Sequence, residues 1–226
     1  MRLLDIDWLA TRWPTENVPG YGEQPMPLSG LANSNAGDKR PFLVFIEEEE
    51  TGDELKDLII DLFGSEDVVV ASRTFNCYHL KAEDIPDTTL RKKYGSTTPA
   101  IYFFGADGKE TGKVTGRKNS KAVFRQMKKA FDDHYDVRLT KWVDRFLDQL
   151  VVIEKAEDAV ANQKKAVETI QDRIAAKDKA NKKLEEDLAE AQKELEAADK
   201  AFADACKALD DMLEIPTKKE SATARK

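Results

Sequence analysis

The sequence predicts an α/β domain followed by a long helical arm, and three observations lead to this prediction. Short runs of β-forming apolar residues alternate with helical patterns between residues 39 and 136, which is typical of a layered α/β domain. Every glycine lies at or before Gly116, and seven of the eight prolines lie at or before Pro99. Residues 137–226 are rich in Ala, Lys and Glu, as long helices are.

Residues 1–38 are predicted to form an irregular N-terminal strap. Four prolines and four glycines interrupt this segment, so little regular structure is expected beyond a first turn around residues 6–12. Trp8, Trp13, Tyr21 and Met26 make the segment too apolar for a free linker. The strap therefore either packs over the following domain, which we favour, or docks on a partner.

Residues 39–136 are predicted to form the α/β domain. The continuous apolar run Pro41–Ile46 predicts a strand that is buried on both faces. Apolar residues then recur at helical spacing from Leu55 to Phe63, and Gly64 ends the helix.

The rest of the domain alternates in the same way. Val68–Val70 is another apolar piece, to which we assign no element. An Ala-Asp-Gly sequence at 106–108 predicts a hairpin turn between the last two strands. The further strands are expected at 75–80, 100–104 and 111–115, and the further helices at 88–94 and 122–135.

Several of these features, in their order, resemble the thioredoxin family. They are the strand Pro41–Ile46, a helix beginning near Thr51, the step Thr97-Thr98-Pro99 and the hairpin Gly105–Lys109. The resemblance covers residues 39–135 and implies a central sheet flanked by helices, with a cis peptide bond before Pro99. It also places Thr51-Gly52-Asp53-Glu54 where the family carries Cys-x-x-Cys. Thr51, Glu54 and Pro99 are therefore the equivalents of the family's site residues.

The residues that stand in place of the family's two cysteines cannot carry out thiol–disulfide exchange. Thiol–disulfide exchange needs a thiolate nucleophile and a resolving thiol. Thr51 cannot supply the first, and Glu54 cannot supply the second. The pattern Thr-x-x-Glu before an apolar periodic run is instead a capping box that begins a helix. We therefore expect a redox-inactive domain with no catalytic residue.

The remaining reactive side chains form no recognisable site. Cys77 lies in a predicted strand and Cys206 in the arm, so both are expected to be inert. The chain has two histidines, His79 and His134, and they are far apart in the sequence. The run Glu47–Glu50 is a solvated loop more often than a cation site. The sequence therefore predicts neither a cofactor nor a metal.

A basic stretch lies around the last domain helix. A solvated face is the default interpretation, and a surface for an acidic partner is the alternative. The stretch consists of Lys113, Arg117, Lys118, Lys121, Arg125, Lys128 and Lys129.

Residues 137–215 are predicted to form a coiled-coil arm, and 216–226 a polar tail. A heptad pattern runs without a break from Leu139, and Pro216 ends it. Lys177 and Asn181 interrupt its apolar seam near the midpoint. This fits a helical hairpin and equally an antiparallel dimer of continuous helices, while an Asn in the seam also suits a parallel dimer. The residues expected to interact are Trp142, Phe146, Leu150, Ile153, Val160, Val167, Ile174, Leu184, Leu188, Leu195, Phe202 and Leu209.

The charged segments of the arm and the width of its apolar stripe lead to two further expectations about its packing. Residues 161–184 are mainly basic and 185–214 mainly acidic, so an antiparallel arrangement brings opposite charges together. The stretch Trp142–Ile153 is too apolar for a seam between two helices. We expect it to pack on a third surface, which is the domain, the strap tryptophans or another chain.

Composition excludes several classes of protein. A net charge of −7 argues against nucleic-acid binding. No apolar run approaches the roughly 18 residues of a membrane span, and Asp5 and Asp7 interrupt any signal-peptide core, so a cytoplasmic protein is expected. The predicted function is a non-enzymatic adapter or structural subunit that binds protein partners, or its own copies, through the arm. The alternatives are a thiol-dependent oxidoreductase-like activity and a chaperone (holdase) that uses the thioredoxin peptide groove.

Overall fold

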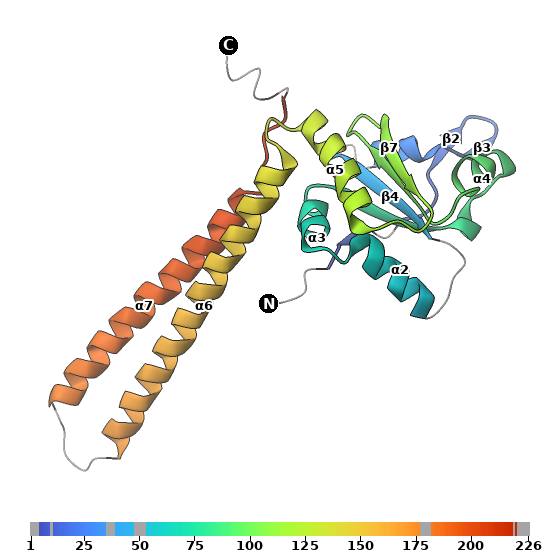
Figure 1. The fold of residues 1–226 in the computed structure, drawn as a ribbon. Coiled ribbons are helices and arrows are strands. Elements are labelled where there is room, and N and C mark those ends of the chain that lie inside the picture. The colour runs from blue at the N-terminus through green and yellow to red at the C-terminus, as the bar shows by residue number, and fades with distance from the viewer. Residues whose placement is uncertain are drawn as a thin grey trace. The chain divides into compact units, whose positions relative to one another are not determined.

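The computed structural model describes residues 5–9, 11–34, 39–47, 53–176, 182–218 and 220, and Figure 1 shows its ribbon. Its elements in chain order are β1 (Trp8–Leu9), β2 (Thr15–Val18), β3 (Gly22–Pro25), the 3₁₀ turn η1 (Leu28–Gly30), α1 (Leu31–Ser34), β4 (Phe42–Glu47), α2 (Asp53–Phe63), α3 (Glu66–Ser72), β5 (Asn76–Lys81), the 3₁₀ turn η2 (Ala82–Asp84), α4 (Thr88–Tyr94), β6 (Ala100–Phe104), β7 (Glu110–Thr115), α5 (Ser120–His134), α6 (Leu139–Ala175) and α7 (Lys182–Asp211).

The chain divides into two compact units. The first contains residues 2–143 and 215–226, and the second contains residues 144–214. The boundary falls inside α6, so the first residues of this helix belong to the first unit. We call the first unit the domain and the second unit the arm.

The domain is built on a five-stranded sheet in the order β1-β5-β4-β6-β7. β4 and β5 are parallel, whereas β6 is antiparallel to both β4 and β7. This confirms the predicted mixed α/β class and the predicted strands at 41–46, 75–80, 100–104 and 111–115. Every residue of β4 is buried, as its continuous apolar run predicts for a strand covered on both faces.

Successive side chains of β4 point to opposite faces of the sheet, and each face carries its own hydrophobic core. Phe42, Val44 and Ile46 face a cluster that includes Leu90 and Tyr94 of α4. Phe45 faces the other way and meets Phe63 of α2, with 5.3 Å between the ring centroids. α2, α3 and α5 all lie on this second side of the sheet.

Local signals explain where the helices begin. Ser65 accepts a hydrogen bond from the Val68 amide and starts α3. Asp87 accepts from the amides of Thr89 and Leu90 and starts α4, while Asn119 caps α5. The apolar run Val68–Val70 thus belongs to a helix that the sequence pattern alone did not assign.

The N-terminal segment packs on its own domain and is more regular than predicted. The Trp13 indole packs against Tyr94 and donates a 2.8 Å hydrogen bond to the Met26 carbonyl. β2 and β3 form an antiparallel hairpin whose turn uses Gly20 at φ 84° and Gly22 at φ 74°. The prediction of an irregular strap was wrong here because these short polar strands show no alternation of apolar and polar residues.

The arm is a hairpin of two helices. α6 ends at Ala175 and α7 begins at Lys182, and the two lie side by side in opposite directions (Figure 1). The Gln149 side chain donates a 2.8 Å hydrogen bond to the Ala205 carbonyl. One continuous helix would separate these two residues by about 84 Å at 1.5 Å per residue, so that alternative is wrong for this structure. The interrupting residues Lys177 and Asn181 lie outside the described residues.

The heptad pattern identifies the face between the two helices. Every described position of the predicted seam is buried or half-buried, and Val160, Val167 and Leu184 are buried. The arm therefore covers much of its own seam. Neither of its helices, nor any other helix in the described part of the chain, combines the length and apolarity of a membrane span.

The expected charge pairing between the two helices is not seen. Within the described part of the arm, the ion pairs are Lys182–Glu186 and Lys207–Asp211, and each runs along α7. Pairs of this i,i+4 kind link neighbouring turns of one helix. The short connection between Ala175 and Lys182 makes the two helices antiparallel, and apolar residues fill the face between them.

Candidate functional site

The structure places one of the predicted site residues, Pro99, at an end of the sheet. β4 and β6 pair up to Ile46 and Ala100, so the next positions of that ladder are Glu47 and Pro99. Glu54 is the second residue of α2 and is exposed. Thr51 lies outside the described residues, and so does the predicted capping box between Thr51 and Glu54.

The Thr98–Pro99 peptide bond is cis, as expected. The Pro99 carbonyl accepts a 2.8 Å hydrogen bond from the amide of Gly116, which directly follows β7. Gly116 has φ 70°, a left-handed conformation that favours glycine. This bond ties the start of β6 to the end of β7.

A carboxylate–imidazole pair lies at the same end of the sheet, and sequence analysis missed it. Glu47 Oε2 and His79 Nε2 are 2.8 Å apart. The Glu47 side chain is 10% exposed, which contradicts the prediction of a solvated loop at this position. The imidazole stacks on Phe45 at 5.1 Å and lies 5.5 Å from the ring of Trp8. A long-range parallel register brings Phe45 beside His79, and no local sequence signal reveals it.

The chemistry available to this pair is limited. A carboxylate can orient an imidazole for acid–base work, but a catalytic site also needs a nucleophile or a metal in reach. Within the described ranges, no group of three His, Cys, Asp or Glu side chains is placed to hold a metal ion. The pair lies among aromatic rings, and we interpret it as part of the packing between β1, β4 and β5.

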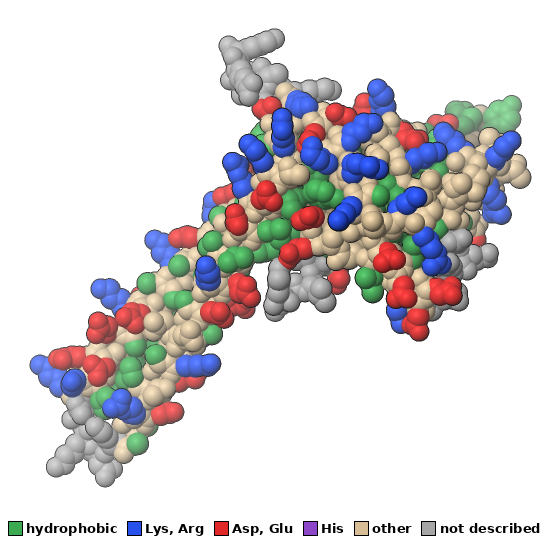
Figure 2. Space-filling model, in the orientation of Figure 1, with side chains coloured by type: hydrophobic (Ala, Val, Ile, Leu, Met, Phe, Trp, Pro, Cys, Tyr) green, Lys and Arg blue, Asp and Glu red, His purple; other side chains and the backbone are tan. Residues whose placement is uncertain are grey.

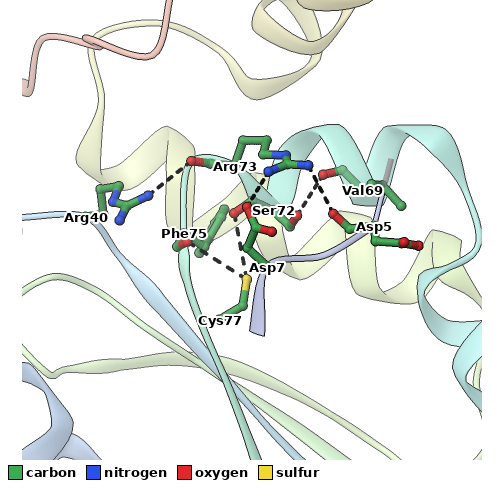
Figure 3. A network of polar contacts seen from close by, with 8 residues as sticks. All are labelled: Asp5, Asp7, Arg40, Val69, Ser72, Arg73, Phe75 and Cys77. Atoms are coloured by element: carbon green, nitrogen blue, oxygen red, sulfur yellow. Dashed lines mark hydrogen bonds and ion pairs between the residues drawn. The ribbon is translucent and has the colours of Figure 1, made fainter. Parts of the chain in front are cut away.

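Cys77 lies within the sheet and is 1% exposed (Figure 3). Its Sγ lies 3.7 Å from the Ser72 carbonyl and 3.9 Å from the Phe75 carbonyl. Burial raises the pKa of the Cys77 thiol to about 12, even though the nearby Arg40 acts in the opposite direction. The thiol is therefore protonated at neutral pH, as the interpretation of an inert buried cysteine requires.

Charged side chains cover the strand segment around this thiol. Arg73 forms an ion pair with Asp7 and donates a 3.1 Å hydrogen bond to the Asp5 carbonyl (Figure 3). Arg40 donates to the Arg73 carbonyl at 3.3 Å. These contacts join the segment before β1 to the end of α3 and help to close the surface over Cys77.

A cavity of about 770 Å³ opens between the β6–β7 turn, the end of α5 and the C-terminal segment. The Lys129 ammonium donates a 2.7 Å hydrogen bond to the Thr111 carbonyl, and Lys39 pairs with Glu220. The charges of its lining balance, so the cavity itself favours neither an anion nor a cation. These charged residues are Lys39, Lys109, Lys129, Lys218, Asp107, Glu110, Asp133 and Glu220.

The predicted interaction residues of the arm do not form one free surface. Trp142 is 6% exposed and packs against Phe131 of α5, with 6.3 Å between the ring centroids. The domain is thus the third surface for the first residues of the wide apolar stripe. Farther along α6, Val151 and Val152 are 46% and 49% exposed.

Comparison with known proteins finds likeness among solved structures. No protein-family model matches the chain. No curated protein matches it either. Among solved structures, a chain described as "DsbH Oxidoreductase" is similar at 15% sequence identity and a TM-score of 0.32. The similarity covers 48% of this chain and 84% of that chain, and likeness at this level assigns no function.

Proposed function

We propose that this protein is a non-enzymatic adapter or structural subunit in which a redox-inactive thioredoxin-like module carries a coiled-coil arm. It binds protein partners through that arm, and it acts in the cytoplasm. The observation that carries the proposal is the state of the domain's cysteine, Cys77, since Cys206, which is half-buried, lies in the arm. The chain has two cysteines, and the one in the domain is buried and protonated.

Topology supports the thioredoxin-like part of the proposal. The sheet combines a parallel pair, β4 and β5, with the antiparallel strands β6 and β7. A cis proline directly precedes β6, beside the end of β4. The family equivalents of the two active cysteines are Thr51 and Glu54, which can form no disulfide.

The arm supports the adapter role. Two helices of 37 and 30 residues use their apolar seam against each other, so the hairpin needs no second chain to cover that seam. Its outer surface is then available to other proteins, and Val151 and Val152 add apolar area to it. A rigid helical hairpin presents such residues at low cost in conformational entropy.

Insulin reduction by dithiothreitol tests the absence of enzyme activity. The full chain should not accelerate insulin precipitation above the protein-free rate, because neither Thr51 nor Cys77 offers a thiolate. Cys77→Ser should behave identically. Acceleration that this substitution abolishes would refute the proposal and favour a thiol-dependent enzyme.

A shortened arm tests the adapter role. Replacing residues 165–193 by a short Gly/Ser loop removes similar lengths of α6 and α7 around the tip and keeps the Gln149–Ala205 contact. Proteins that co-purify with the full chain from its native source should be lost from the shortened chain. Equal recovery of the same proteins by both chains would exclude the removed part of the arm as the binding element.

A further inference from the structure

The outer face of α5 carries a stripe of positive charge. Lys121, Arg125 and Lys129 are exposed and four residues apart, so they lie on one side of the helix. Arg117 and Lys118, both exposed, come directly before the helix. Figure 2 shows blue side chains gathered over the region that α5 occupies in Figure 1. We call these five residues the basic stripe.

The stripe conflicts with the electrostatics of its own helix. The N-terminal end of a helix carries partial positive charge and favours acidic residues. α2 and α3 follow this rule with Asp53, Glu54, Glu66 and Asp67, whereas the first turn of α5 contains no acidic residue. Like charges four residues apart also repel one another.

Three of the five cations lack a carboxylate partner in the described part of the chain. Among the described residues, no carboxylate lies within 4.0 Å of the charged atoms of Lys118, Lys121 or Arg125. Lys128, beside the stripe, is different because its ammonium pairs with Asp132 at 2.9 Å. The sequence therefore places Lys118 and Lys121 at the end of a helix that disfavours cations, and such local conflicts concentrate at functional surfaces.

We infer that the basic stripe docks an acidic segment of a partner protein. From Lys121 to Lys129 the stripe spans about 12 Å, and its charges repeat about every 6 Å. Carboxylates four residues apart on a helix repeat at the same distance. A partner helix with acidic residues at this spacing matches the stripe charge for charge.

Charge elsewhere in the chain favours a protein partner over nucleic acid. The whole chain carries −7, and α7 alone has ten acidic residues against five lysines. A net negative charge opposes the association of a polyanion with the chain as a whole, whereas a short acidic segment can be bound by a local group of cations. The inference rests on the proposed adapter function and assigns the domain its own contact, separate from the arm.

Binding of a synthetic peptide to the full chain tests the inference. The probe is a capped helical peptide with Glu at every fourth position, and its control has Gln in place of Glu. Fluorescence anisotropy should detect the Glu peptide alone, and Kd should rise at least fivefold between 50 and 300 mM salt. No binding of the Glu peptide, or equal binding of the Gln peptide, would overturn the inference.

Matched variants locate the contact. Lys118→Gln, Lys121→Gln and Arg125→Gln together should raise Kd at least tenfold, whereas Lys56→Gln, Lys92→Gln and Lys93→Gln, with the same charge change elsewhere on the domain, should raise it less than twofold. Lys118→Arg with Lys121→Arg should retain binding. If Kd rose equally in the two triple variants, the peptide would be responding to the net charge of the chain and not to the basic stripe, which would refute the inference.

Two further readouts separate the alternatives. The denaturation midpoint of the basic-stripe triple variant should stay equal or rise, because repulsion is relieved. A fall would contradict the premise that these cations do not stabilise the fold.

A 20-nucleotide single strand of DNA that binds more tightly than the Glu peptide would overturn the inference in favour of nucleic acid. Capture of partners through the arm is measured separately, so failure here leaves the adapter proposal standing.

Discussion

Burial of Cys77 links one side chain to the stability of the whole domain. The folded chain keeps the thiol protonated up to its pKa of about 12, whereas the ordinary value is 9.0. Between these two values the unfolded chain loses a proton that the folded chain retains. Folding stability from this group is therefore complete below pH 9 and decreases as the pH rises toward 12.

Alkaline denaturation should reveal this difference. Between pH 8 and pH 10, the free energy of unfolding should fall by about 1.4 kcal/mol more in the natural chain than in Cys77→Ala. Urea denaturation of both chains at the two pH values measures the difference, and other titrating groups cancel between them. If the free energy of unfolding fell by the same amount in both chains, water would reach the Cys77 thiol in the folded chain.

Prediction from sequence succeeded for Cys77 and failed for Glu47. The apolar neighbours of Cys77 in the chain already indicated a buried strand. Glu47 begins a run of four glutamates, which locally indicates a solvated loop. Its burial depends on His79, 32 residues away, and on a strand register that no local pattern encodes.

Helix caps are the clearest determinants at the scale of elements. The Asp87 carboxylate accepts from the amides of Thr89 and Leu90 at 2.7 and 2.8 Å. Asp87→Ala should lower the free energy of unfolding by about 0.5–2 kcal/mol, because it leaves these amides without their cap. Asp84→Ala, an exposed neighbour in η2, is the control and should change it by less than about 0.5 kcal/mol. Equal effects on chemical denaturation would show that Asp87 is not the cap.

The topology of the arm is also testable as an element. In a Cys206→Ser background, cysteines at Gln149 and Ala205 should be joined within one chain by a short bis-maleimide, because these residues are in contact. The control pair is Gln149 with Glu185, about 30 Å farther along α7. Mass spectrometry distinguishes the products. Crosslinks between chains instead of within one chain would establish a dimer of helices.

The arm shows what a heptad pattern in the sequence can predict and what it cannot. The heptad positions predicted which residues face inward, because a seam is a local property of each helix. Periodicity did not decide between a hairpin and a dimer, since both bury the same seam. It also did not reveal β2 and β3, whose polar strands depend on the conformations of Gly20 and Gly22.

At the scale of the whole molecule, the domain includes the beginning of α6. Leu139, Trp142 and Val143 are 0%, 6% and 2% exposed and belong to the domain unit. The wide apolar stripe thus completes the core at its first residues. Deleting residues 139–226 should therefore destabilise the domain rather than leave it intact.

A single substitution tests this assignment. Trp142→Ala should lower the free energy of unfolding by about 3–5 kcal/mol, because it removes a buried indole. Val151→Ala on the same helix, where the side chain is 46% exposed, should cost less than about 0.5 kcal/mol. Thermal or urea denaturation compares them. A loss below about 1 kcal/mol for Trp142→Ala would place this residue outside the core.

The chain returns to the domain where it left it. After α7, Thr217 forms an isolated antiparallel bridge with Tyr135, and the Asp136 amide donates to the Pro216 carbonyl at 3.3 Å. Residues 144–214 are therefore topologically an insertion, with both ends fixed at one point of the domain. Matched helical turns can be added or removed at the tip of the hairpin while the strands of the domain keep their register. Evolution or design could thus change the reach of the arm independently of the domain that carries it.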